Sequence, residues 1–435
     1  MLNISRRNLL RFIGAVVLFL ASVPLVKKFL GGKITVGFFG QSDEPIQDKE
    51  KSKVYWVKNG NPAQNTHKII EMMGGIGHFV GKDDIVILKP NAQWWNQGRT
   101  NLWAMKGFID LVLALPGFEG EVIIAENQHF MDSSLPQGEE DNVRGWVKIS
   151  EINGDINGVH HSLNSLVELY NKNGIHNVSI SFLRDGGPKY DVWGNGQNGG
   201  IVTSPQEGDG YVWTDNDYIF KGFFGFKKWP VKMTYPIFTS KFSGITVDLK
   251  NGAFQRDGKG GGSYFQDKPV KLINFAVLND HGEDTGITSS IKNYMGITDL
   301  SCGYWGEGPE GYFNVHTCGE NYFPYAKAGP LGHFMKTVRK ADLNIVTAEW
   351  VGWGDRIDIN KATRMRSVLV STDPVALDYC GAKHLVLPLS KNQKLHDPDN
   401  TKSPIHKFLK LAQKVSGVGN MSDEQIDLIK YDFKA

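Results

Sequence analysis

The chain has 435 residues, of which 40% are hydrophobic and 22% are charged, a composition typical of a folded globular protein. This length permits one large domain or two ordinary ones. The formal net charge is only +2, and no basic run interleaved with aromatic residues follows the N-terminal segment. These features disfavour nucleic acid as a partner.

The N-terminal segment has the pattern of an export signal. Arg6 and Arg7 precede an apolar run over residues 12–26, and two lysines follow that run. The arrangement resembles a twin-arginine signal, so we predict that residues 1–30 engage the twin-arginine export machinery. An N-terminal membrane anchor is the alternative, although the run is shorter than the about 20 residues that a full span needs.

No small-x-small cleavage site is evident after the apolar run, so the segment can be retained on the mature protein. Residues 12–26 would then associate with the membrane. We therefore expect a protein that is exported across the cytoplasmic membrane and is either periplasmic or membrane-anchored.

Three cysteines are too few for a disulfide framework, and no C-x-x-C pair occurs. Cys302 and Cys318 could form one disulfide in an oxidising compartment, could be plain unpaired thiols, or could contribute with His316 to a metal site. Cys380 lies in an apolar helical stretch, and we expect it in the core.

Residues 31–53 form a linker of Gly, Asp, Glu and Lys, and the folded part begins at residue 54. Short apolar strands then alternate with helices, which is the order of an α/β fold with a mostly parallel sheet and flanking helices in Rossmann-like layers. The predicted strands cover residues 54–57, 82–88, 122–125, 177–183, 271–278, 343–348 and 366–371. The predicted helices cover residues 66–73, 102–115, 162–171, 331–339 and 407–415, and another begins at residue 374.

The pattern changes between residues 186 and 262, where Gly, Asn, Asp and aromatic residues dominate. Asn251-Gly252 is a signal for a tight turn between strands. We predict a β-rich insertion in the α/β domain of residues 54–435, and we expect it to cover the sheet edge as a lid. Its tryptophans, Trp193, Trp213 and Trp229, could stack on sugar rings.

Polar residues follow four of the predicted strands. They are Lys89 and Asn91, Glu126 and Asn127, Asn279 with Asp280 and His281, and Glu349. Because open α/β sheets bind ligands at the carboxyl ends of parallel strands, we expect these groups to converge on one edge. Lys292 and Asn293 follow on a short helix.

This collection suits a ligand that carries a carboxylate or a phosphate. The predicted substrate-binding residues are Lys89, Asn91, Asn293 and Glu349. His281 can transfer protons near neutral pH, so we expect it to act with Asp280 and Lys292 in catalysis. As an alternative, Glu126, Asp280 and His281 could share a divalent metal ion.

Structural roles compete with these assignments. Lys89 and Asn91 can simply organise the turn around Pro90. Lys292 can belong to a helix C-cap because Gly296 follows, and Asp280 can cap the next helix. Asp373 before Pro374 is a typical helix start, whereas Asp378 could face either solvent or the site.

Three motifs occur in order along the chain. They are Lys89-Pro90-Asn91, the Asn279-Asp280-His281 segment with Thr288-x-x-x-Lys292-Asn293-x-x-Gly296, and Ser371-Thr-Asp-Pro-Val-Ala-Leu-Asp378. Together they resemble the bacterial and archaeal proteins catalogued as domain of unknown function 362, with gaps, from about residue 54 to the C-terminus. The resemblance implies a fold but no established reaction.

This chain departs from that family in two places. Family members often carry a lysine where Asn279 stands, and some carry a ferredoxin-like iron–sulfur module whose cysteine motif is missing here. The cofactor therefore stays open, with a divalent metal ion as one candidate.

Two functional classes follow. The first is an exported enzyme that acts on a small or cell-surface anionic substrate by acid–base or metal-assisted chemistry. The alternative is an extracytoplasmic protein that binds a carbohydrate or an anion without catalysis. A metal at Glu126, Asp280 and His281 would favour the enzyme, and an occupied aromatic groove remote from them would favour binding.

Overall fold

The structure is a computed structural model, and it describes residues 50–127, 144–183, 200–215, 218–221, 228–300, 303, 308–316 and 324–434. The described residues all belong to one compact unit, Glu50–Ala435. The predicted signal of residues 1–30 and most of the predicted linker lie outside the described residues. No helix in the described ranges is both long enough and apolar enough to cross a membrane.

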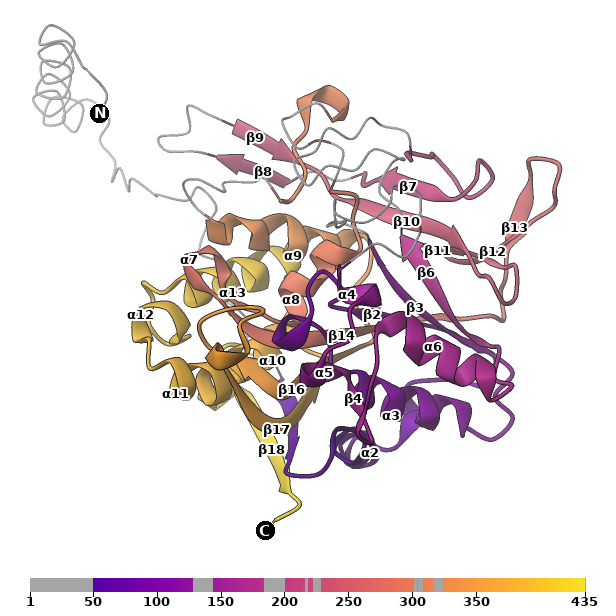
Figure 1. Ribbon diagram of the computed structural model, residues 1–435. Helices are drawn as coiled ribbons and strands as arrows, with labels where there is room; N and C mark the ends of the chain where they lie inside the picture. The colour runs from indigo at the N-terminus through magenta and orange to yellow at the C-terminus, as the bar shows by residue number, and fades with distance from the viewer. Residues whose placement is uncertain are drawn as a thin grey trace, which may run out of the picture. The chain divides into compact units, whose positions relative to one another are not determined.

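A nine-stranded sheet forms the centre of this unit (Figure 1). Its strands are β1 (Ser52–Lys58), β2 (Ile85–Pro90), β3 (Glu121–Asn127), β6 (Val178–Leu183), β14 (Val270–His281), β15 (Gly286–Thr288), β16 (Leu343–Gly352), β17 (Ala362–Ser371) and β18 (Ile426–Asp432). The order is β18-β1-β17-β16-β14-β2-β3-β6, and β15 pairs with β14. All neighbours from β16 to β6 are parallel, whereas β17 is antiparallel to both of its neighbours. The predicted α/β fold with a mostly parallel sheet is confirmed.

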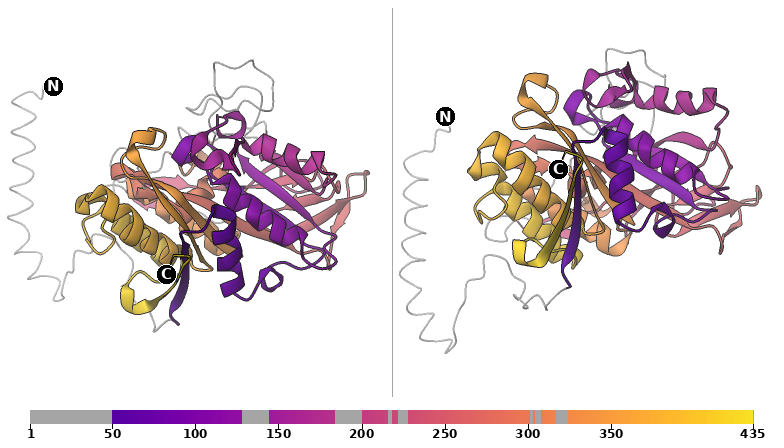
Figure 2. Two further views of the ribbon diagram at one scale, coloured as in Figure 1. Left: turned by 60° about the horizontal axis from the view of Figure 1, so that its bottom comes forward. Right: turned by 90° about the horizontal axis from the view of Figure 1, so that it is seen from below.

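Helices cover both faces of the sheet, and Figure 2 shows the two layers from below. One layer holds α2 (Pro62–Met72), α3 (Leu102–Leu113) and α6 (Leu163–Lys172), and the other holds α9 (Ala328–Thr337), α10 (Pro374–Gly381) and α13 (Pro404–Ser416). The shorter helices are α4 (Arg144–Val147), α5 (Glu151–Gly154), α7 (Gly282–Thr285), α8 (Ser290–Asn293), α11 (Leu387–Ser390) and α12 (Gln393–His396).

Strand β2 explains why the sheet needs two helical layers. Its side chains alternate between the faces, so Ile85 and Ile87 join the core under α9, α10 and α13. Val86 and Leu88 join the separate core under α2, α3 and α6. A strand that is apolar on both faces is stable only when both faces are covered.

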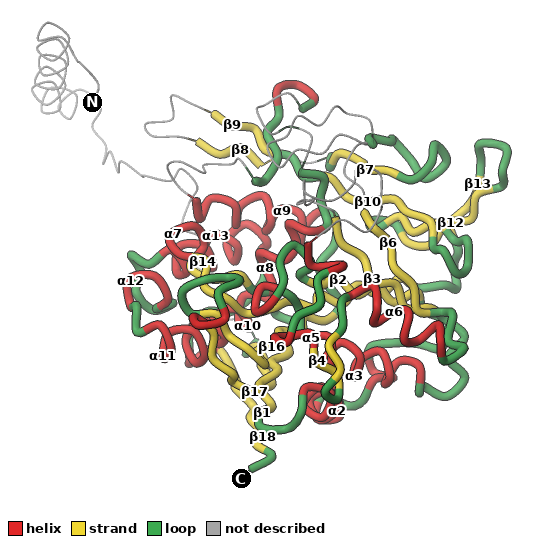
Figure 3. The backbone as a smooth tube through the Cα atoms, viewed as in Figure 1, coloured by secondary structure: helices red, strands yellow, loops and turns green. Residues whose placement is uncertain are grey.

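The insertion is β-rich, as predicted (Figure 3). Its strands β7 (Gly210–Trp213), β10 (Thr234–Thr239), β11 (Thr246–Asp248), β12 (Gly252–Arg256) and β13 (Gly262–Tyr264) form an antiparallel sheet. The insertion holds one further antiparallel pair, β8 (Tyr218–Lys221) with β9 (Lys228–Val231). Outside the insertion, β4 (Asp155–Ile156) pairs with β5 (Val159–His160). Trp193 lies outside the described residues.

Candidate functional site

A cavity of about 660 Å³ opens at the carboxyl ends of β2, β3 and β14. The structure brings nearly all of the predicted polar groups to its wall. They are Lys89, Asn91, Glu126, Asn127, Asn279, Asp280, His281, Lys292 and Asn293. The convergence has a simple topological cause, since β14, β2 and β3 are adjacent parallel strands that end at the same edge.

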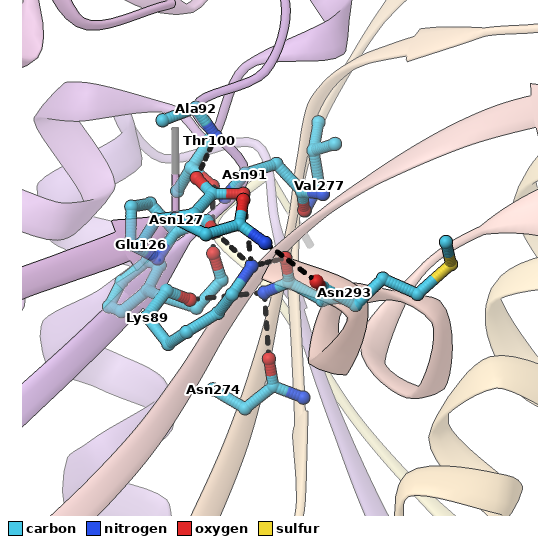
Figure 4. Close-up of polar contacts among 12 residues, drawn as sticks. Lys89, Asn91, Ala92, Thr100, Glu126, Asn127, Asn274, Val277 and Asn293 are labelled. Carbon is cyan, nitrogen blue, oxygen red and sulfur yellow. Dashed lines mark hydrogen bonds and ion pairs between the residues drawn. The ribbon is translucent and has the colours of Figure 1, made fainter. Parts of the chain in front are cut away.

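Lys89 lies at the base of the cavity with all of its donors in use (Figure 4). The side chain is 1% exposed, and its Nζ donates to Pro90 O at 2.7 Å, to Glu126 Oε1 at 3.2 Å and to Asn293 Oδ1. Burial lowers the pKa of Lys89 to about 8 and raises the pKa of Glu126 to about 7, while the attraction between the two charges opposes both shifts. An ammonium group has three donors, so Lys89 has none left for a ligand.

Gly296 explains the last position of the second motif. It ends the short 3-10 turn Tyr294–Gly296, and a Cβ there would overlap the ammonium of Lys89 and the carboxylate of Glu126. Asn293 completes this packing, because its Nδ2 donates to Lys89 O at 3.0 Å and to Asn274 Oδ1 at 2.7 Å. Gly296 is therefore required by close approach to an ion pair, and the C-cap explanation of this segment is insufficient.

Asn91 joins β2 to β14. Its Oδ1 accepts from the backbone N–H of Val277 at 2.9 Å, and its own backbone N–H donates to Thr100 Oγ1 at 2.8 Å. Its amide NH₂ donates to no described residue, so a ligand in the cavity could still accept from it.

His281 lies in a chain of four polar side chains. Its Nε2 is 3.1 Å from Asp284 Oδ2, and its Nδ1 is 2.8 Å from Thr288 Oγ1. Lys327 donates to both oxygens of Asp284, at 3.0 and 3.2 Å. Burial, helped by the charge of Lys292, lowers the pKa of His281 to about 3.

These hydrogen bonds determine which ring nitrogen of His281 carries the proton. Burial alone would raise the pKa of Asp284, but the hydrogen bond from His281 and the charge of Lys327 outweigh burial and hold that pKa below its usual range. The ionised carboxylate can only accept, so Nε2–H donates to Asp284 and Nδ1 accepts from the Thr288 hydroxyl. The expectation that His281 itself titrates near neutral pH is wrong, because the imidazole is buried and both of its nitrogens are occupied.

Asp280 is held from the opposite side by a residue that the sequence did not reveal. His396 Nε2 is 2.6 Å from Asp280 Oδ1, and His396 Nδ1 is 2.7 Å from Ser390 Oγ. The backbone N–H of Gly282 also donates to Asp280 Oδ1 at 2.8 Å. Burial alone would raise the pKa of Asp280, but these hydrogen bonds lower it, so the group stays ionised.

The expected metal ligands do not form one set. The described residues contain no cluster of three or more His, Cys, Asp or Glu side chains that could hold a metal ion. Glu126 binds Lys89, Asp280 binds His396, and His281 binds Asp284, each in a separate direction. The predicted site at these three residues is corrected accordingly. Cys302 and Cys318 lie outside the described residues.

Glu349 was expected in the site but does not line the cavity. The pairing of β16 with β17 shifts register between Ala348 and Trp350, so the strand is irregular at this residue. Its Oε1 accepts from Arg364 Nε at 2.7 Å, and the carboxylate is buried beside that arginine. Glu349 thus belongs to the β16–β17 pair and not to the substrate-binding group.

Lys292 differs from the other groups on the wall. It lies on α8 and is partly buried, and its side-chain amine makes no hydrogen bond or ion pair with any residue that the structure describes. Burial lowers the pKa of Lys292 to about 7, helped by the charges of Lys327, Arg356 and Lys89 and opposed by the attraction of Asp284. The amine is therefore available to a ligand.

Asp378 holds the helix that carries Lys292. Its carboxylate accepts from Ser290 N at 2.8 Å, Ser290 Oγ at 2.7 Å and Ile291 N at 3.0 Å, and burial raises its pKa to about 6. Asp378 of the third motif thus caps α8, the helix that belongs to the second motif. The other aspartate of that motif, Asp373, accepts from Val375 N and Ala376 N and caps α10, as predicted.

Charged, aromatic and apolar side chains together line the rest of the cavity. Arg356 lies 5.3 Å from the ring of Trp94, in the loop after β16. Leu300, His316 and Lys327 also line the cavity, but no described residue between 200 and 262 does so. The predicted lid role is therefore not found for the part of the insertion that the structure describes.

Comparison with known families bears on the motifs. Residues 270–383 match the family described as Domain of unknown function (DUF362). The matched segment contains His281, Lys292 and Asp378, and it supports the resemblance drawn from the motifs, whereas Lys89 and Asn91 precede it. Comparisons with curated proteins and with solved structures found no match.

Proposed function

We propose that the cavity is the active site of an enzyme that binds a small carboxylate- or phosphate-bearing substrate and moves protons with the amine of Lys292. One observation carries the proposal. Lys292 is a partly buried lysine on the cavity wall that has no partner among the described residues, although Lys89 on the same wall uses every donor it has.

Two cations on the wall can attract an anion. Lys292 and Arg356 have no carboxylate partner among the described side chains, while Asp280 and Asp284 are each held by a basic residue. An anionic group that enters the cavity would therefore meet two cations that form no described salt bridge, on a wall that also carries Glu283 and Asp355. Their attraction is stronger in a partly enclosed site than in bulk water.

The chemistry follows from the environment of the amine. With a pKa near 7, Lys292 populates both the ammonium and the amine forms at neutral pH, so it can give or take a proton. Thr288 offers a second polar group on the wall, and its hydroxyl proton is directed to His281 Nδ1. Asp280 would supply a fixed negative charge.

Binding is tested first with inorganic phosphate and with small carboxylates, by thermal unfolding. We expect these anions to raise the unfolding temperature of the wild type and to raise it much less in Lys292→Met. Lys340→Met is the matched control, because Lys340 is exposed and does not line the cavity. Equal stabilisation of all three proteins would contradict the proposed site.

Turnover is tested in deuterated water with a panel of small carboxylates and phosphate esters. We expect the wild type to incorporate deuterium into at least one of them, and Lys292→Met to incorporate none. Anion binding without any exchange or product would instead support the alternative of a binding protein without catalysis.

For the location of this activity, we propose export by the twin-arginine route, with residues 12–26 as a retained membrane anchor. The support is the Arg6-Arg7 pair before a short apolar run and the lack of an evident cleavage site after it. The substrate would then be a small or cell-surface molecule outside the cytoplasmic membrane.

A further inference from the structure

Three described lysines line the cavity, and they differ in how their ammonium groups are bound. Lys89 donates to three oxygens, and Lys327 donates to both oxygens of Asp284. Lys292 donates to none of the described residues. A bound ammonium must lose its partners before it can react, so only Lys292 is ready to act as a nucleophile.

The surroundings of Lys292 favour its neutral form. Lys327, Arg356 and Lys89 all act on it with like charge, and burial removes part of its hydration. The nearest opposing charge, Asp284, is shared with His281 and Lys327. A lysine that is desolvated and placed beside other cations is the arrangement that activates an amine for covalent catalysis.

We propose that Lys292 forms a Schiff base with the carbonyl carbon of a small oxo acid whose carboxylate lies at Arg356. The inference rests on the proposed function and names the substrate class and the covalent step for the same cavity. A volume of about 660 Å³ is ample for such a molecule and falls in the usual range for ligand pockets.

The step balances without a further reactant. The lone pair of the Lys292 nitrogen forms a C–N bond while the C=O π electrons move to oxygen, and a proton passes from nitrogen to that oxygen. The C–O bond then breaks, and the oxygen leaves as water with one more proton from the solvent. The product is a protonated C=N bond, whose positive charge can take up electrons from the adjacent carbon.

The test uses the whole protein with pyruvate and sodium borohydride at about pH 7, followed by peptide mass spectrometry. Borohydride reduces a Schiff base to a stable secondary amine, which marks the lysine that formed it. We expect a reduced pyruvate adduct on Lys292 at least about tenfold above that on exposed Lys340, because the Lys292 amine is desolvated beside other cations and is bound by no described residue. Lys89 and Lys327 should stay unmodified, and Lys292→Arg should remove the adduct.

The role of Arg356 is tested with acetone, which has a carbonyl group but no carboxylate. Arg356→Gln should lower the pyruvate adduct on Lys292 several-fold more than it lowers the acetone adduct. Equal losses for the two probes would contradict the carboxylate position at Arg356.

The outcomes separate the two proposals. Labelling of Lys292 no greater than that of Lys340, together with phosphate stabilisation that still depends on Lys292, would overturn the Schiff base and leave the anion-binding active site standing. Loss of both effects would overturn both. Selective labelling of Lys292 would support both.

Discussion

At Gly296 the absence of a side chain decides how the site is built. The backbone there lies against the buried pair of Lys89 and Glu126, and that closeness keeps the pair out of water. A buried ion pair is stable only when its remaining donors and acceptors are satisfied, and here Asn293 and Ala92 N satisfy them. Because Gly296 has no Cβ, the segment that follows α8 can pack directly against Lys89 and Glu126.

We predict that Gly296→Ala destabilises the protein by about 1–3 kcal/mol, because the added methyl group overlaps both charged groups. Urea unfolding at neutral pH measures the effect. Gly77→Ala is the control, since its nearest neighbour would lie at an ordinary 3.4 Å. A similar loss in both variants would contradict the close approach at Gly296.

Lys292→Met should stabilise the protein by about 1–3 kcal/mol below pH 7, because methionine avoids an unpaired charge in a partly buried position. The pKa of Lys292 is lowered in the folded state, so the unfolded chain binds more protons between about pH 7 and the ordinary lysine range. Wild-type stability therefore rises with pH across that window, and the advantage of the variant fades. Urea unfolding at several pH values measures it.

Lys89→Met is the matched comparison, and we expect it to destabilise the protein by about 3–5 kcal/mol, because it leaves Glu126 buried without its partner. The same substitution at two lysines of one cavity should thus act in opposite directions. Destabilisation by both would show that Lys292 has a structural partner.

At the scale of elements, α8 depends on a residue from α10. Its backbone N–H groups at Ser290 and Ile291 donate to Asp378, so the direction of α8 is fixed by a carboxylate far along the chain. Asp373 does the same for α10 itself. Two aspartates of one motif therefore cap two different helices, and only one of those helices carries a cavity residue.

We predict that Asp378→Ala and Asp373→Ala each lower stability by about 1–2 kcal/mol through loss of a helix cap. Only Asp378→Ala should also change the reactivity of Lys292 toward acetic anhydride, because only Asp378 holds α8. Mass spectrometry of the labelled peptides gives that readout. Unchanged reactivity in Asp378→Ala would show that α8 keeps its place without the cap.

At the scale of the whole molecule, the sequence predicted the sheet and the edge at which the cavity lies. The sequences of β2, β3, β14 and β16 are mostly apolar because both faces of these strands are buried, so they were recognisable. Strand β18 was missed, since it lies at the sheet edge and most of its residues are partly or fully exposed. Its pattern is correspondingly weak.

The chemistry of the edge was less predictable than its location. The partners that decide it, such as His396 for Asp280 and Arg364 for Glu349, depend on side-chain directions and strand pairing that spacing does not encode. The register shift beside Glu349, which the sequence did not reveal, accompanies its position outside the cavity lining. Local chain signals, such as the Asp373 cap, were correct because they need no distant partner.

The proposed export route rests on the N-terminal segment. We predict that replacing Arg6 and Arg7 together by lysine leaves the protein in the cytoplasm, because twin-arginine export depends on that pair. Cell fractionation measures the distribution, and replacing Lys27 and Lys28 by glutamine provides a control. Continued export of the double lysine variant would contradict the proposed route.

The availability of the Lys292 amine is the central claim, and its reaction with acetic anhydride as a function of pH tests it directly. We predict that Lys292 becomes reactive with a midpoint near pH 7, while Lys89 and Lys327 stay protected by their hydrogen bonds, with exposed Lys340 as the reference lysine. A midpoint for Lys292 like that of Lys340, or protection like that of Lys89, would contradict it.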